Sequence, residues 1–260
     1  MIETLARLGY ASKALVYAIV GGLAMAAATS RGGRVTDTSG ALRVILRQPY
    51  GQGLLIVLAI GLCGYAVWRL LDAFMDPDRH GTTFRGLVIR IGNVIRGAIY
   101  GTLGIEAFRL AQGLRRSGGD EAELWAARFM DLPLGEWLVG LAGLIIAVYG
   151  VSQVIGSLKP GMAKSLDLSP IPSSLRPAIV RVSRFGVGAR GVIIAAAGTF
   201  LVRAALERDP SEAAGTRESI VELAGAVNGR WLLAAIGMGL IAYSIHQAVE
   251  AWCRRIRPVM

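Results

Sequence analysis

The chain has 260 residues, of which 53% are hydrophobic and only 18% are charged. An average soluble domain has about 25% charged residues, so this composition excludes an ordinary water-soluble enzyme and a disordered chain. Lysine and arginine outnumber aspartate and glutamate by 28 to 18, which gives a net charge of +10. Together with the hydrophobicity, this charge indicates a lipid bilayer, with anionic lipids among its components, as the partner rather than nucleic acid.

Six apolar stretches are each close to the length of about 20 residues that a helix needs to cross the hydrocarbon core. They cover residues 10–29, 53–75, 92–112, 134–156, 187–206 and 230–252. Backbone polar groups must bond to one another inside hydrocarbon, so these stretches predict helices. We therefore expect an all-α, polytopic membrane protein with six transmembrane helices.

The odd-numbered spans share one pattern, and the even-numbered spans share another. The odd copies are Arg7-Leu8-Gly9 with Lys13, Tyr17 and Gly21; Arg90-Ile91-Gly92 with Arg96, Tyr100 and Gly104; and Arg184-Phe185-Gly186 with Arg190, Ile194 and Gly198. The even copies are Gly61, Tyr65 and Arg69; Ile145, Tyr149 and Gln153; and Gly239, Tyr243 and Gln247. Three copies in register indicate an internal triplication of a helix–connector–helix unit.

Because each unit crosses the membrane twice, successive units enter from the same side and are parallel repeats. We expect them to close into a pseudo-threefold bundle, and a row of units is the alternative. The predicted membrane units cover residues 1–78, 79–158 and 184–260, with a Pro/Ser-rich cytoplasmic linker over residues 159–183.

Each connector contains a short run with apolar residues on one helical face, at Gly40–Leu46, Glu123–Met130 and Glu218–Val227. We expect these runs to lie in the membrane interface with that face toward the acyl chains. The alternative is a loop helix that packs on the protein.

The distribution of basic residues predicts the orientation. The side that holds both termini and the 76–91 and 157–186 loops carries 16 Lys/Arg, and the side of the three connectors carries 12. Because cytoplasmic loops are enriched in Lys and Arg, we expect a multi-pass protein of the inner (plasma) membrane with both termini cytoplasmic.

Three segments of the first unit carry a resemblance to a known family. They are the opening ARLGYASKALVYAIVGGL, the connector ALRVILRQPYG and the second helix GYAVWRLLDAF. They resemble the bacterial membrane family called domain of unknown function 1206. The resemblance implies three tandem two-helix units over nearly the whole chain, and it carries over no activity and no catalytic residue.

Ionisable groups inside a span are candidates for function because they are costly there. The candidate contacts for an anion or a lipid headgroup are Lys13, Arg96, Arg190, Arg69, Tyr65, Tyr149, Tyr243, Gln153 and Gln247. If they face inward, they form a basic, tyrosine-lined vestibule. The alternatives are that the cations extend to the membrane interface as anchors and that the tyrosine pairs only join helices. The candidate helix-packing glycines are Gly9, Gly21, Gly92, Gly104, Gly186 and Gly198.

The sequence contains no HExxH, Walker, GxSxG or CxxCH motif, so we expect no enzyme, no catalytic residue, no metal and no cofactor. The favoured function is a non-catalytic structural, lipid-interacting or partner-binding helical protein. The alternative is a transporter or channel for a small anionic solute that uses the repeated cations. The sequence identifies neither a protein partner nor an oligomeric state.

Overall fold

In the computed structural model of the chain, the described residues are 2–29, 37–75, 83–114, 121–130, 132, 134–159, 168–209, 213 and 229–253. These residues form eight helices and no strand, which confirms the expected all-α class. The long helices are α1 (Ile2–Ala28), α3 (Gly51–Met75), α4 (Phe84–Ala111), α6 (Gly135–Leu158), α7 (Arg176–Glu207) and α9 (Gly229–Cys253), and the short ones are α2 (Thr38–Leu46) and α5 (Glu121–Met130).

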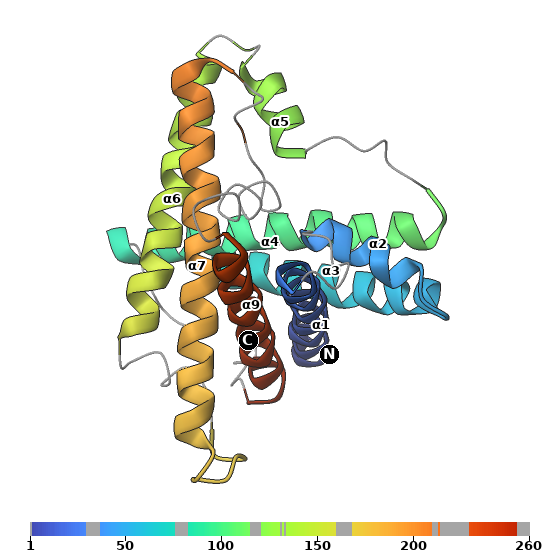
Figure 1. Ribbon diagram of the computed structural model, residues 1–260. Helices are drawn as coiled ribbons and strands as arrows, with labels where there is room; N and C mark the ends of the chain where they lie inside the picture. Colours follow the sequence, from blue (N-terminus) through green and yellow to red (C-terminus); the bar gives the residue numbers. More distant parts are fainter. Residues whose placement is uncertain are drawn as a thin grey trace.

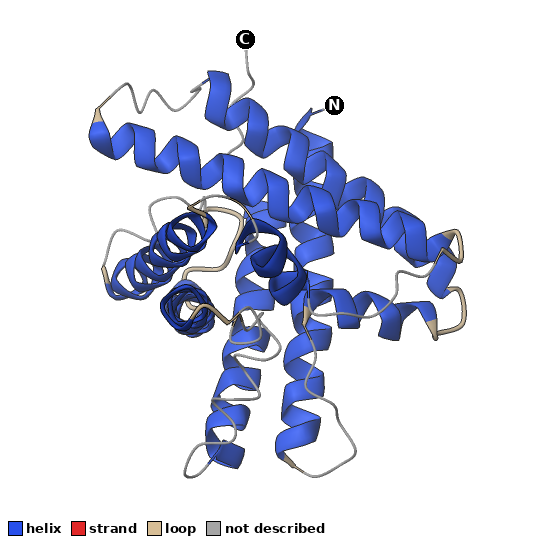
Figure 2. Cartoon of the chain, turned by 90° about the horizontal axis from the view of Figure 1, so that it is seen from above, coloured by secondary structure: helices blue, strands red, loops and turns tan. Residues whose placement is uncertain are grey.

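The long helices form three side-by-side pairs: α3 with α4, α6 with α7, and α1 with α9 (Figure 1). Each pair joins the second helix of one unit to the first helix of the next, and the last unit pairs with the first. The pairs run in different directions (Figure 2), so the six helices do not share one axis direction as a simple bundle would require. The two helices of one unit therefore belong to different pairs.

Five helices are long and apolar enough to cross a membrane, which supports a multi-pass membrane protein. They are α1, α3, α6, α7 and α9. The predicted third span, 92–112, lies in α4, which is not among the five although it has 28 residues. Asn93, Arg96 and Glu106 interrupt its apolar sequence, and its role as a sixth span stays a prediction.

The apolar surface of α6 fits this environment. Its exposed residues include Leu141, Leu144, Val148, Val151 and Ile155. Their spacing of three and four places them on one face of the helix. An exposed apolar stripe of this length is unfavourable in water and favourable against acyl chains.

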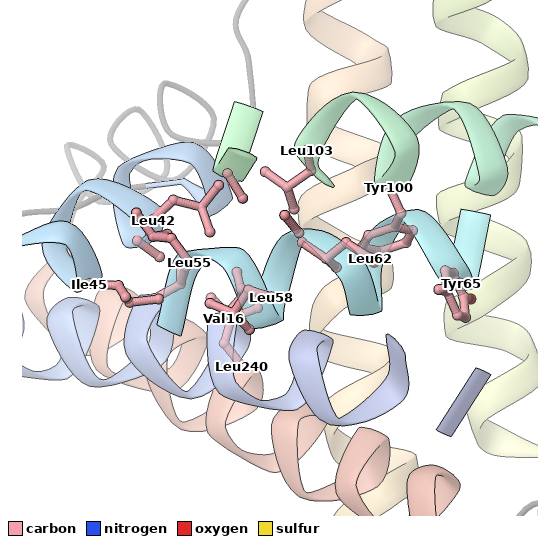
Figure 3. Packing of buried hydrophobic residues seen from close by; sticks show 14 of the residues in the cluster. Val16, Leu42, Ile45, Leu55, Leu58, Leu62, Tyr65, Tyr100, Leu103 and Leu240 are labelled. Atoms are coloured by element: carbon pink, nitrogen blue, oxygen red, sulfur yellow. The ribbon is translucent and has the colours of Figure 1, made fainter. Parts of the chain in front are cut away.

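One buried apolar core joins α1, α2, α3, α4 and α9 (Figure 3). Val16 of α1 and Leu240 of α9 lie beside Leu58 and Leu62 of α3, and Leu103 of α4 completes this side of the core. The core therefore includes residues from all three units.

Three glycines at equivalent positions set the spacing within the helix pairs. A side-chain carbon at Gly21 would overlap Gly237 of α9, one at Gly104 would overlap α3 at Cys63, and one at Gly198 would overlap α6 at Ala147. Each of these glycines therefore permits close backbone contact with the preceding unit, or with the last unit in the case of Gly21.

At one end of the molecule, three arginines at equivalent positions bind the carbonyl groups that end the neighbouring helices. Arg7 donates to Ala251 and Trp252 at 2.8 and 2.7 Å, and Arg90 donates to Ala73 at 2.6 Å. Arg184 donates to Ser157 at 2.6 Å and also to Leu158. Cations stabilise the unpaired carbonyls of a helix C-terminus, so each arginine joins its unit to the one before it.

At the opposite end, the start of the second long helix of each unit (α3, α6 or α9) meets the end of the first long helix of the next unit (α4, α7 or α1). Gln52 donates to the Ala111 carbonyl at 2.6 Å, and Arg230 donates to the Ala28 carbonyl at 2.5 Å. Glu136 pairs with Arg208 at 2.9 Å. The contacts of α1 with α9 at both ends show that these two helices are antiparallel.

The short helix α2 corrects the expectation for the first connector. α2 covers the predicted run Gly40–Leu46, and its apolar residues Ala41, Leu42 and Ile45 are buried against the protein (Figure 3). The apolar face of α2 therefore packs on α1, α3 and α4 instead of facing acyl chains. α5 covers the predicted run Glu123–Met130, and the run Glu218–Val227 lies outside the described residues.

The first helix of the third unit also begins earlier than expected. α7 starts at Arg176, inside the linker predicted over residues 159–183. Pro177 stands in its first turn, where the missing N–H of proline costs no helical hydrogen bond. The proline therefore starts the helix rather than extending the loop.

Candidate functional site

The repeated cations of α1, α4 and α7 each meet the tyrosine on the second long helix of their own unit. Lys13 Nζ lies 3.3 Å from the Tyr65 hydroxyl and 4.4 Å from the centre of its ring. Arg96 Nε donates to the Tyr149 hydroxyl at 2.8 Å. The Arg190 guanidinium lies 5.1 Å from the ring centre of Tyr243.

A second set of contacts links two of the three cations to the following unit. Lys13 Nζ lies 4.6 Å from the ring centre of Tyr100 on α4, and Arg190 Nε donates to the Tyr17 hydroxyl on α1 at 3.1 Å. The corresponding partner of Arg96 would be at residue 194, which is isoleucine. The pattern therefore occurs at two of the three interfaces.

The tyrosines themselves pack in the same way at these two interfaces. Tyr65 and Tyr100 are edge to face, with ring centres 5.1 Å apart and an angle of 87°. Tyr243 and Tyr17 have ring centres 4.8 Å apart and the same angle of 87°. Aromatic pairs favour this geometry, so the two interfaces are built alike.

On the second long helix of each unit, a predicted polar residue follows the tyrosine by one turn. The hydrogen-bond partners of these polar residues differ among the units. Arg69 donates to Tyr65 at 2.8 Å and to Tyr10 at 3.0 Å, and Gln153 donates to Tyr149 at 2.6 Å. Gln247 donates to Glu250 at 2.9 Å instead. Arg69 and Gln153 thus hold the hydroxyl of the preceding tyrosine in place, whereas the side-chain amide of Gln247 donates to a carboxylate.

Asn93 of α4 connects the cations of the first two units. Its side-chain oxygen accepts hydrogen bonds from Arg69 at 3.2 Å and from Arg96 at 3.1 Å. Its amide donates to Asp72 at 2.8 Å, and Asp72 also lies 3.4 Å from Arg69. Asn93 thus links two arginines to a buried carboxylate through hydrogen bonds.

We call these residues the central cluster: Tyr10, Lys13, Tyr17, Tyr65, Arg69, Asp72, Asn93, Arg96, Tyr100, Tyr149, Gln153, Arg190 and Tyr243. Lys13 is 3% exposed and Arg69 is 6% exposed. The interface-anchor alternative is therefore wrong for Lys13, because its ammonium lies among tyrosine rings rather than at the surface. The Lys13 ammonium faces the rings of Tyr10, Tyr65 and Tyr100, an arrangement in which a cation and an aromatic ring attract each other.

The expected vestibule stays a prediction. The repeated cations do converge, since Tyr17 and Tyr100 hydroxyls lie 3.1 Å apart and Arg190 reaches both. Among the described residues, however, the cations are bonded to tyrosines and to Asn93. Tyrosine side chains thus occupy the positions where the vestibule was expected to hold a solute.

The candidate contacts from the sequence did not include five members of the central cluster: Tyr10, Tyr17, Asp72, Asn93 and Tyr100. Asn93 stands at the position of Tyr10 in the repeat, and an asparagine inside an apolar span, three residues before Arg96, is a signal that could have identified it. Trp68 was not among the candidates either, and its ring lies 4.4 Å from the Arg69 guanidinium.

The glycines predicted to pack helices fall into two groups. Gly21, Gly104 and Gly198 contact the neighbouring unit, and Gly9 and Gly186 contact the second helix of their own unit. Gly92 has open space around it. In the part of the chain that the structure describes, no three His, Cys, Asp or Glu side chains gather in a way that could hold a metal ion.

The comparisons with known proteins agree with the repeat. The family model described as Domain of Unknown Function (DUF1206) matches residues 8–76, 91–159 and 185–254. A protein of Bacillus subtilis (strain 168), described as uncharacterized protein YxxB, is 34% identical over 249 residues, which cover 96% of this chain and 90% of that relative. No solved structure matches the chain. Three matched segments at equivalent positions, together with this relative, show that the chain belongs to the DUF1206 family, as three tandem copies of its unit.

Proposed function

We propose that the protein is a non-catalytic scaffold of the inner membrane that interacts with lipids, in which three two-helix units close into a pseudo-threefold ring. The observation that carries the proposal is the central cluster, where the repeated cations bond to tyrosines of their own and of neighbouring units. A group that is bonded in this way joins helices, because breaking its contacts would leave a charge buried without a partner.

The contacts at the two ends of the molecule support the ring. Each end of the molecule has one contact for every pair of neighbouring units. At one end these are the contacts of Arg7, Arg90 and Arg184, and at the other those of Gln52, Glu136 and Arg230. Each set includes a contact between the third unit and the first. A row of three units would lack that contact.

The proposed topology places both termini in the cytoplasm and crosses the membrane six times, with α4 as the third span. The excess of Lys and Arg on the side of the termini supports it. A reporter enzyme fused after residue 120 tests it: the reporter should behave as extracytoplasmic, and cytosolic activity would contradict the topology.

A flux assay in liposomes tests the scaffold role against transport. We expect no flux of small anions above that of protein-free vesicles. We also expect Lys13→Gln, Arg96→Gln and Arg190→Gln to lower the yield and stability of the folded protein. Saturable anion flux that these variants abolish while they remain folded would overturn the proposal.

A further inference from the structure

A groove lies outside the central cluster, between α2 and the C-terminal part of α4. It has a volume of about 630 Å³ and is lined by Arg43, Leu46, Arg47, Glu106, Arg109, Leu110 and Leu114. We propose that this groove binds the headgroup of an anionic phospholipid, which rests on the lipid-interacting function proposed above and names its ligand class and site.

The charge of the groove favours an anion. Three arginines line it against one carboxylate, that of Glu106. Glu106 accepts a hydrogen bond from Ser39 at 2.6 Å. Within the described residues, no ion pair or side-chain hydrogen bond occupies Arg43, Arg47 or Arg109. Arginine is suited to phosphate because its guanidinium can donate two parallel hydrogen bonds.

The apolar part of the lining favours a lipid over a free anion. Leu46, Leu110 and Leu114 line the same groove as the arginines. A phospholipid presents a phosphate next to acyl chains, so it can use both kinds of lining at once. The groove also lies at the ends of α2 and α4. In the proposed topology the end of α4 reaches the membrane surface, which is the level at which headgroups lie.

The basic residues of the groove are not imposed by the repeat. In the second unit, the positions of Arg43 and Arg47 are taken by Ala127 and Asp131. A residue that only maintained the common framework would be expected in more than one unit. The groove is therefore a feature of the first unit and of its contact with α4.

Native mass spectrometry of the full chain, released from mixed micelles, measures the retention of phosphatidylglycerol against phosphatidylcholine. The test variant is R43Q/R47Q/R109Q, and the control K159Q/R181Q/R203Q removes the same charge from exposed positions outside the groove. Each basic residue near an anionic headgroup contributes about a factor of five, so the test variant should bind phosphatidylglycerol about 100-fold more weakly. The control should match the wild type.

The variant Glu106→Gln should change binding in the opposite direction. Glutamine can still accept the hydrogen bond from Ser39 and removes the negative charge, so phosphatidylglycerol should bind about fivefold more tightly. Weaker binding in this variant would contradict the assignment.

The outcomes separate this site from the proposed function. Equal retention of phosphatidylglycerol by R43Q/R47Q/R109Q and the wild type would overturn the groove and leave the scaffold standing. Displacement of the lipid by millimolar inorganic phosphate that itself binds the wild type would assign the groove to a free anion and overturn the lipid. Failure of the proposed function would appear separately, as anion flux in the liposome assay.

Discussion

In the first unit, Gly9 of α1 lies against Gly61 and Tyr65 of α3, and in the third unit Gly186 of α7 lies against Ala242 and Tyr243 of α9. In the second unit, the equivalent Gly92 of α4 has open space around it. There, α4 and α6 meet through the hydrogen bond from Arg96 to Tyr149. The two helices of a unit thus pack closely at this glycine in the first and third units, which we call closed, and not in the second unit, which we call open.

This difference indicates which contacts hold the fold together. All three pairs between units keep a glycine at the contact, and all three arginine caps are present. The contact within a unit varies, whereas the glycine and the arginine cap between units are present at all three interfaces. The fold is therefore held together by the helix pairs that neighbouring units form. The two helices of one unit can lie apart while these pairs are kept.

The largest expected loss of stability comes from removing Arg69, a charge that the second unit lacks at the equivalent position. Arg69→Gln copies Gln153 and leaves the buried Asp72 without its cation, so it should lower the free energy of unfolding by about 3–5 kcal/mol. Unfolding by SDS in mixed micelles measures it. The double variant R69Q/D72N removes both charges and should recover most of the loss; a double variant as unstable as the single one would contradict this account.

The next prediction compares the closed and open contacts directly. Gly186→Ala places a side-chain carbon against the backbone of Tyr243 and should lower the free energy of unfolding by about 1–3 kcal/mol. Gly92→Ala meets no atom and should raise it by about 0.5–1 kcal/mol, because alanine is the better helix former. Equal losses at the two positions would show that the second unit is closed like the others.

A smaller effect tests whether the ring closes between the third unit and the first. Arg7→Ala and Arg184→Ala each remove a guanidinium from the carbonyl end of a neighbouring helix, and each should cost about 1–2 kcal/mol. The two losses should be equal if α9 and α1 meet as α6 and α7 do. A loss at Arg184 with none at Arg7, measured by the same unfolding method, would favour an open row.

The sequence was enough to predict the units, the long helices and the equivalence of Lys13, Arg96 and Arg190, because an apolar run and a repeat period are local signals. It did not show that Lys13 is enclosed by tyrosines of two units, since a cation one turn inside a span can also extend to the interface. The apolar face of α2 was equally ambiguous. An amphipathic pattern identifies which face is buried and leaves open whether lipid or protein covers it.

The last prediction concerns the interface that lacks its tyrosine. Ile194 stands where Tyr17 and Tyr100 stand in the other units, so Ile194→Tyr would supply the missing partner for Arg96 and an edge-to-face neighbour for Tyr149. If the three interfaces have the same geometry, the new aromatic pair should raise the free energy of unfolding by about 0.5–1.5 kcal/mol. Ile194→Phe is the matched control, because it adds the ring without the hydroxyl and should give a smaller gain. A loss in both variants would mean that the second and third units meet at a different spacing, and that isoleucine is there because a larger ring does not fit.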